Sequence, residues 1–231
     1  GTGSYSIVTS GAGSDQINIG GFSRVNSGAG NDFIYSASWS NNDVIDAGDG
    51  DNHVYVHGDS NHVLSGSGAD TIEAVGSCLI ESGGGNDSIT AVAGYHNINA
   101  GDGDNLISVL SDDMGHIVSG AGKDFIKISG WGAHGVHANA GDDIIFAAAG
   151  NNSIDAGGGN DFVFSGNNDD FVTGEMGTDV LEGGEGNDTL TDNSGSTLFV
   201  GGLGDDSLQG SNGSEIYIGG MGNDILKTGT G

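Results

Sequence analysis

The residues from Gly174 to Lys227 form six nonapeptides in tandem, and this repeat constrains the fold more than any other feature of the chain. The units that start at Gly183, Gly201 and Gly219 match G-G-x-G-x-D-x-U-x at every constrained position, where U is apolar. Glycine tolerates backbone angles that other residues avoid, so each unit can turn tightly and direct carbonyl groups inward. The x-U-x segment is a short strand with one buried side chain. The repeat therefore predicts a solenoid, because units must stack before a core exists.

The sixth position of the nonapeptide is the acidic one. Four of the six units have aspartate there, namely Asp179, Asp188, Asp206 and Asp224, while Thr197 and Glu215 replace it in the other two. Carboxylate and carbonyl oxygens are hard ligands of the kind that Ca²⁺ prefers. This pattern resembles the RTX (repeats-in-toxin) calcium-binding β-roll family. The resemblance implies an all-β, right-handed parallel β-helix or β-roll solenoid with two short strands per coil, and calcium ions held between loops of neighbouring coils.

The same loop recurs about every 18 residues in the earlier part of the chain, with Ser or Ala in place of the first glycine. Complete copies begin at Ser10, Ser27, Ala47, Ser65, Ser82, Ala100, Ser119 and Ala156, and the copy AGDDII at Ala140 is expected to be two residues short. We predict one β-roll over residues 1–231. Residues 1–173 form irregular coils with one calcium-type loop per coil, and residues 174–231 form tandem nonapeptides close to the consensus.

The sixth-position residues of these loops predict a file of metal ligands on one side of the solenoid, which we call the front. They are Asp15, Asp32, Asn52, Asp70, Asp87, Asn105, Asp124, Asp143, Asp161 and Asp179, with gaps of 17 to 20 residues. The opposite side, the back, becomes acidic at Asp170, Asp188, Asp206 and Asp224. We therefore expect the file to pass from front to back near residues 170–180. The predicted ligands are the ten front residues with Asp188, Asp206 and Asp224, and they predict roughly ten Ca²⁺ ions.

Two columns of mostly β-branched residues predict the core. The front column is expected at Ile17, Ile34, Val54, Ile72, Ile89, Ile107, Ile126, Ile145, Val163 and Leu181. The back column is expected at Val8, Val25, Ile45, Val63, Ile80, Ile98, Ile117, Ala138, Ile154 and Val172. The back counterparts of the aspartate position are then Ser6, Ser23, Asp43, Asn61, Cys78, His96, Gly115, Val136 and Asn152, most of which lack a carboxylate.

Charge and composition exclude several classes of protein. The chain has 231 residues, 32 acidic against 4 basic side chains and a net charge of −28, with 48 Gly and no Pro. Such a charge opposes a compact state unless counterions are bound. No basic patch is present for nucleic acid, and the apolar runs are too short for a transmembrane helix. The single cysteine, Cys78, excludes an intrachain disulfide.

No zinc-protease helix motif, G-x-S-x-G elbow or carboxylate pair outside the repeat is present, so an enzyme is not expected. The resemblance implies an extracellular or cell-surface protein exported by type I secretion. We predict a calcium-binding segment that folds on extracellular Ca²⁺ and serves as a structural or adhesive element. One alternative is a calcium-dependent surface layer or filament, because both ends fall inside the repeat and copies can associate end to end.

A second alternative is a polysaccharide-binding module beside a secreted enzyme or toxin domain. It is suggested by aromatic residues and histidines in the back loops, including Trp39, Tyr95 and Trp131. The spacing of His134 and His137 also suggests a transition-metal site, although no third ligand recurs at a fixed offset. The competing interpretation is that these side chains close the coil where calcium is absent. Ice binding is disfavoured because the outward positions beside the front loops are irregular.

Overall fold

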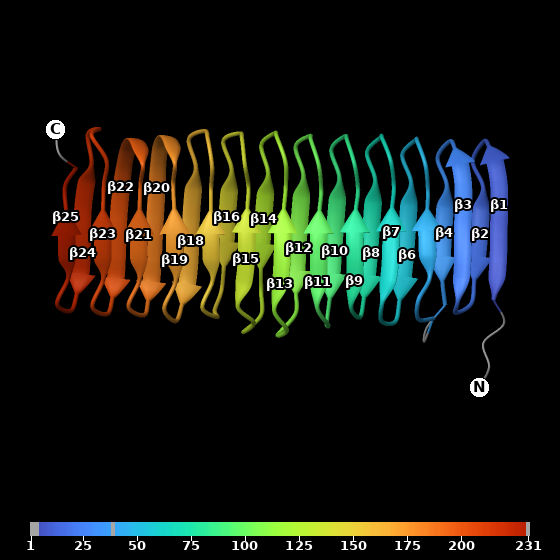
Figure 1. Ribbon diagram of the computed structural model, residues 1–231, viewed down its shortest axis with the longest axis horizontal. Helices are drawn as coiled ribbons and strands as arrows, with labels where there is room; N and C mark the ends of the chain where they lie inside the picture. Colours follow the sequence, from blue (N-terminus) through green and yellow to red (C-terminus); the bar gives the residue numbers. More distant parts are fainter. Residues whose placement is uncertain (1–4, 38–39, 230–231) are drawn as a thin grey trace.

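The computed structural model describes residues 5–37 and 40–229. Within this part the chain forms 25 β-strands and no helix. The coils stack side by side along one axis, from the N-terminal to the C-terminal end of an elongated solenoid (Figure 1). The odd-numbered strands form a 13-stranded sheet and the even-numbered strands a 12-stranded sheet, and all pairings are parallel. The predicted all-β parallel solenoid is therefore confirmed.

The two sheets, called A and B, take alternate strands of the chain. Sheet A contains β1 (Ser6–Ala12), β3 (Ser23–Ala29), β5 (Val44–Asp46), β7 (Asn61–Leu64), β9 (Cys78–Glu81), β11 (His96–Asn99), β13 (Gly115–Val118), β15 (His134–His137), β17 (Ser153–Asp155), β19 (Phe171–Thr173), β21 (Thr189–Thr191), β23 (Ser207–Gln209) and β25 (Ile225–Lys227). Sheet B contains β2 (Gln16–Ile19), β4 (Phe33–Ser36), β6 (His53–His57), β8 (Thr71–Val75), β10 (Ser88–Val92), β12 (Leu106–Leu110), β14 (Phe125–Ile128), β16 (Ile144–Ala147), β18 (Phe162–Asn167), β20 (Met176–Glu185), β22 (Ser194–Leu203) and β24 (Ile216–Met221). Front loops lead from sheet A to sheet B, and back loops lead from sheet B to sheet A.

The core is a thin layer between the two sheets. In sheet B, Ile72, Ile89 and Ile107 pair in register on successive strands, and all three are fully buried. In sheet A, Ile80 and Ile98 form the equivalent column. Side chains alternate between inside and outside along each strand, as a strand with one buried face requires. The column prediction is confirmed along most of the chain.

The coil that contains β15 differs from the predicted register. The loop before Asp143 is complete, because Ala138 and Asn139 supply its first two positions, and Asn139 has φ 74° where other loops have glycine. Val136 pairs with core residues of both neighbouring strands, so it is the core residue of this coil. His134 then occupies the aspartate-equivalent position on the back. The prediction was wrong because asparagine also enters the left-handed region and can replace glycine there.

The loop between β9 and β10 illustrates why glycine alternates along the turns. A Cβ on Gly83, which has φ +101°, would lie 1.8 Å from the carbonyl oxygen of Gly66 in the preceding coil. Gly85 has φ +127° and a similar contact with Gly68. Gly84 lies between them, and its nearest contact would be at 4.0 Å. The loops therefore stack so closely that two of the three positions exclude a side chain.

Gly83→Ala and Gly84→Ala form a matched pair for this stacking. We expect Gly83→Ala to lower stability by more than about 1 kcal/mol, because the left-handed backbone and the carbonyl contact are both incompatible with Cβ. Gly84→Ala should stay within about 0.5 kcal/mol of the parent chain. Thermal unfolding of both variants in one buffer measures the difference, and equal melting temperatures would contradict the proposed stacking constraint.

Candidate metal-binding loops

The sixth-position residues of the front loops are joined by a continuous ladder of hydrogen bonds. The backbone N–H of Asp143 donates to Oδ1 of Asp161 at 2.8 Å, and the N–H of Asp161 donates to Oδ1 of Asp179 at 2.9 Å. The same bond occurs at every step from Asp15 to Asp179. The structure thus brings all ten front residues named from the sequence into one file.

The second carboxylate oxygen of these aspartates faces inward without a hydrogen bond from the described residues. Ten buried Oδ2 atoms have this property, those of Asp32, Asp70, Asp87, Asp124, Asp143, Asp161, Asp170, Asp179, Asp188 and Asp206. Serine hydroxyls lie beside four of these carboxylates, where Ser65, Ser82, Ser119 and Ser165 partly offset the rise in the pKa of Asp70, Asp87, Asp124 and Asp170. A buried carboxylate oxygen without a donor costs free energy unless a proton or a cation compensates it. The loops therefore have the property expected of cation sites.

A second ladder runs along the back of the last coils. The backbone N–H groups of Asn152, Asp170, Asp188 and Asp206 each donate to Oδ1 of the equivalent residue one coil later, at 2.7 to 3.1 Å. This back file overlaps the end of the front file, because Asp170 precedes Asp179 along the chain. The arrangement agrees with the change of side expected near residues 170–180.

Two further carboxylates lie in these loops although the predicted ligand set omits them. Asp170 lies in a loop where Asn168, at φ 80°, replaces a glycine. Asp192 occupies the first position of a front loop, is buried, and accepts a hydrogen bond at 2.7 Å from the hydroxyl of Thr197, the residue at the sixth position. The sequence could have identified Asp192, because the nonapeptide that has Thr197 at its sixth position has an acidic residue at its first position.

Four of the predicted ligands differ from the rest. Oδ2 of Asp15 accepts a hydrogen bond from the hydroxyl of Ser10. Asp224 is only half-buried. Asn52 and Asn105 continue the front ladder through Oδ1, and their Nδ2 groups donate to backbone carbonyls of the loops. These four residues therefore lack the buried, unpartnered oxygen that the other predicted ligands share, with Asn52 and Asn105 having no carboxylate at all.

Burial changes the electrostatics of the files. It raises the pKa of Asp161 and of Asp170 to about 7, with a smaller contribution from neighbouring aspartates. Burial also raises the pKa of Asp143 and of Asp188 to about 6. Removal from water disfavours the bare carboxylate, and each like charge in the next coil adds to the effect. The loops thus favour a bound proton or cation over an isolated anion.

The space beside these carboxylates is kept open by glycine in the last coils. A Cβ on Gly183 would lie 2.2 Å from Oδ2 of Asp188 and 2.7 Å from the carbonyl oxygen of Gly201. The carboxylate and the next coil's carbonyl therefore approach the same small volume. Among the described residues, no cluster of three or more His, Cys, Asp or Glu side chains could hold a metal ion. The donor set is one carboxylate with backbone carbonyls, which fits Ca²⁺ rather than a transition metal.

The histidines do not form the transition-metal site that the spacing suggested. His134 is buried on the inner face of β15, whereas His137 is exposed on the outer face, because residues three apart in a strand point to opposite sides. Burial lowers the pKa of His134 and of His96. Cys78 is buried as well, and burial raises the pKa of its thiol to about 12. Trp39 lies outside the described residues.

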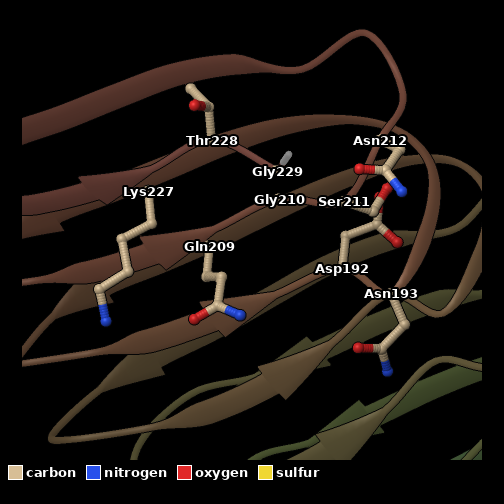
Figure 2. A pocket seen from close by; sticks show the side chains of 9 residues that line it. All are labelled: Asp192, Asn193, Gln209, Gly210, Ser211, Asn212, Lys227, Thr228 and Gly229. Carbon is tan, nitrogen blue, oxygen red and sulfur yellow. The ribbon is translucent and has the colours of Figure 1, made fainter. Parts of the chain in front are cut away.

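A polar hollow lies near the C-terminal end of the solenoid (Figure 2). It is lined by Asp192, Asn193, Gln209, Gly210, Ser211, Asn212, Lys227, Thr228 and Gly229. Figure 2 shows Gln209 and Lys227 projecting from neighbouring strands, with Asp192 beside Ser211 at the loop end. Asp192 is the only acidic residue of this lining, and Thr197 already donates to it. The hollow therefore offers a single carboxylate and does not extend the aspartate files.

Within the described residues, no helix has the length and apolarity that a membrane span needs. The family model of the RTX calcium-binding nonapeptide repeat matches residues 20–38, 40–72, 137–172, 166–190, 173–196 and 191–226. These matches together cover more than half of the sequence and include the back file of aspartates. No curated protein and no solved structure matches the chain at a significant level. From the matched repeats and the parallel solenoid that they build, we conclude that the chain belongs to the RTX calcium-binding nonapeptide repeat family.

Proposed function

We propose that this chain is a calcium-dependent folding module of a secreted bacterial protein and serves there as a structural or adhesive segment. The observation that carries the proposal is the set of ten buried aspartate oxygens without a hydrogen-bond donor. Each belongs to a carboxylate whose other oxygen is held in a ladder. A divalent cation compensates such an oxygen and joins it to carbonyls of the same loops. No catalytic role is assigned to the chain.

The proposal includes about ten Ca²⁺ ions per chain, held by the aspartates of the two files. Ions in that number would offset most of the net charge of −28. Because the loops exist only in the folded chain, the free energy of calcium binding contributes directly to folding. At the low calcium of a cytosol the charge would keep the chain unfolded, and at extracellular calcium the chain would fold. Membership of the RTX family supports an extracellular location, and export by type I secretion is part of the proposal.

A polysaccharide-binding role is the second candidate, and exposed aromatic rings favour it. On the outer face of sheet B, the rings of Tyr35 and Tyr55 stack with centroids 5.2 Å apart. The Trp131 side chain is 72% exposed in a back loop. Aromatic rings of this kind contact the apolar faces of ligands at low entropic cost. Electrophoresis through gels that contain dextran tests this role, with Tyr55→Ala and Trp131→Ala as variants; retardation that neither variant reduces would contradict it.

A calcium titration followed by far-ultraviolet circular dichroism tests the folding switch. We expect a cooperative change from coil to β-structure at roughly 10⁻⁴ to 10⁻³ M calcium, the range of extracellular calcium modules. Magnesium should not replace calcium, because it demands a more rigid octahedral shell and loses water reluctantly. A chain with full β-structure in chelator at neutral pH would contradict the proposal.

Protons should partly replace calcium. Nine buried aspartates have raised pKa values, so the folded chain binds protons more tightly than the unfolded chain. Their stabilising effect is present in acid and is lost as the pH rises, through a pKa of about 6 for Asp143 and of about 7 for Asp161. In chelator, we therefore expect β-structure to increase as the pH falls from about 8 to about 5. The apparent calcium affinity should fall over the same range.

The buried histidines oppose this trend. Burial lowers the pKa of His96 and of His134 from the usual 6.5, so the folded chain loses stability relative to the unfolded chain as the pH falls below 6.5. Because only two histidines oppose nine aspartates, the net change in stability with pH should have the sign that the aspartates give it. Circular dichroism in chelator measures it. Loss of β-structure on mild acidification would show that the histidines dominate.

A further inference from the structure

Asn52 makes a set of contacts that no aspartate of the files can make. Its Oδ1 accepts the ladder hydrogen bond from the N–H of Asp32 at 3.0 Å. The two N–H bonds of its Nδ2 face three carbonyl oxygens within hydrogen-bond distance, those of Gly48 at 3.0 Å, Gly50 at 2.9 Å and Ser65 at 3.2 Å. The first two belong to its own loop and the third belongs to the next coil. The amide nitrogen therefore lies inside a small cage of backbone oxygens.

The same cage occurs three coils later. Nδ2 of Asn105 lies within hydrogen-bond distance of the carbonyls of Gly101, Gly103 and Ser119, at 3.0 to 3.1 Å, and its Oδ1 accepts the ladder bond from the N–H of Asp87. Both loops have the sequence Ala-Gly-Asp-Gly-Asp-Asn. On the back, Nδ2 of Asn152 reaches the carbonyls of Ala149, Gly150 and Ser165 at 3.0 to 3.3 Å. All three asparagines are buried.

Asparagine and aspartate have the same shape, so the comparison fixes where the unpartnered oxygens point. In both residues Oδ1 accepts the ladder bond, which leaves Nδ2 of Asn52 and Oδ2 of Asp70 in equivalent positions. The amide orientation cannot be reversed without placing an oxygen against three carbonyl oxygens. An aspartate oxygen in that position faces the carbonyls as an anion and needs a cation or a proton between them. In Asn52 the N–H groups of the amide carry partial positive charge at this position, so no cation or proton is needed.

The first residue of the front loops is serine in some and alanine in others, and alanine also begins aspartate loops, since Ala138 and Ala156 begin those of Asp143 and Asp161. Loops that end in Asp70, Asp87 and Asp124 begin with serine, and the hydroxyl of Ser65 donates to the next coil's carbonyl, that of Ser82, at 3.0 Å. The two Asn front loops begin with alanine, which has no hydroxyl. In these two loops the asparagine amide donates to the first carbonyl of the next coil's loop, which accepts from a serine hydroxyl in the serine loops. In the two Asn front loops the amide therefore supplies a donor that alanine lacks, whereas the alanine loops of Asp143 and Asp161 have neither a hydroxyl nor an amide at these two positions.

We propose that Asn52, Asn105 and Asn152 are internal substitutes for the cation. Their amide nitrogens occupy the place at which calcium would be bound in the aspartate loops, so these three loops close without a metal ion. The inference rests on the proposed calcium-binding function and refines it, because Asn52 and Asn105 are then not calcium ligands. Calcium is confined to the aspartate loops. The row of calcium sites along the front file is interrupted at Asn52 and at Asn105.

The test is to exchange the amide for a carboxylate of the same shape. Asn52→Asp should raise the number of calcium ions bound per chain, measured by atomic emission after equilibrium dialysis. It should also raise the calcium concentration at the midpoint of folding, because one more anion must be compensated. Asn97→Asp is the matched control, since Asn97 is exposed on the outer face of β11 and gains the same charge. The control should leave the bound number unchanged.

A second variant removes the amide without adding charge. Asn52→Ala should lower the melting temperature in calcium while the number of bound ions stays the same. A lower number in Asn52→Ala, or an unchanged number in Asn52→Asp, would overturn the inference. If the parent chain bound no calcium, the proposed function would fail, and the melting temperature in chelator would decide the inference separately. Asn52→Asp should then melt below Asn97→Asp, and equal values would overturn it.

Discussion

The hydrogen bond from each loop to the aspartate of the next coil is the interaction on which the loops depend. It fixes the carboxylate in one orientation, with Oδ1 on the N–H of the preceding coil and Oδ2 buried and facing inward, as at Asp161 and Asp179. A hydrogen bond to a charged group contributes about 1.5–3 kcal/mol, but an unsatisfied buried charge costs at least as much. The ladder therefore stabilises the solenoid only when the second oxygen is compensated. This requirement couples the fold to a cation, a proton or an amide.

The core and the loops have separate roles in this architecture. Columns such as Ile72, Ile89 and Ile107 bury apolar surface and set the register of the coils, and they need no ion. Each strand is short, so a coil contributes few buried side chains and depends on its neighbours. The loops close the coils, and they carry most of the buried charge. The sheets thus determine how coils stack, while the loops determine the conditions under which stacking is favourable.

Periodicity was sufficient to predict the parallel solenoid, the core columns and the alignment of the sixth-position residues, because each depends on spacing alone. The failures lie where one residue replaces another in the same backbone role. Asn139 adopts the left-handed angle of a glycine, and this hid a complete loop. Spacing therefore indicated Ala138 for the core column instead of Val136, and Val136 for the aspartate-equivalent position instead of His134. Asp192 compensates for Thr197 across the loop, a contact that spacing does not encode. The contacts of the Asn52 amide likewise require the orientation of a side chain in three dimensions.

The difference between an asparagine loop and an aspartate loop lies in one atom. Both side chains hold the ladder through Oδ1, so the backbone of the coil is the same in either case. At the second atom the sign of the local charge is opposite, and the surrounding carbonyls attract the amide and repel the carboxylate. It follows that the number of loops in such a solenoid does not equal its cation requirement. The requirement depends on which residue faces the carbonyls, and the sequence can distribute it coil by coil without changing the fold.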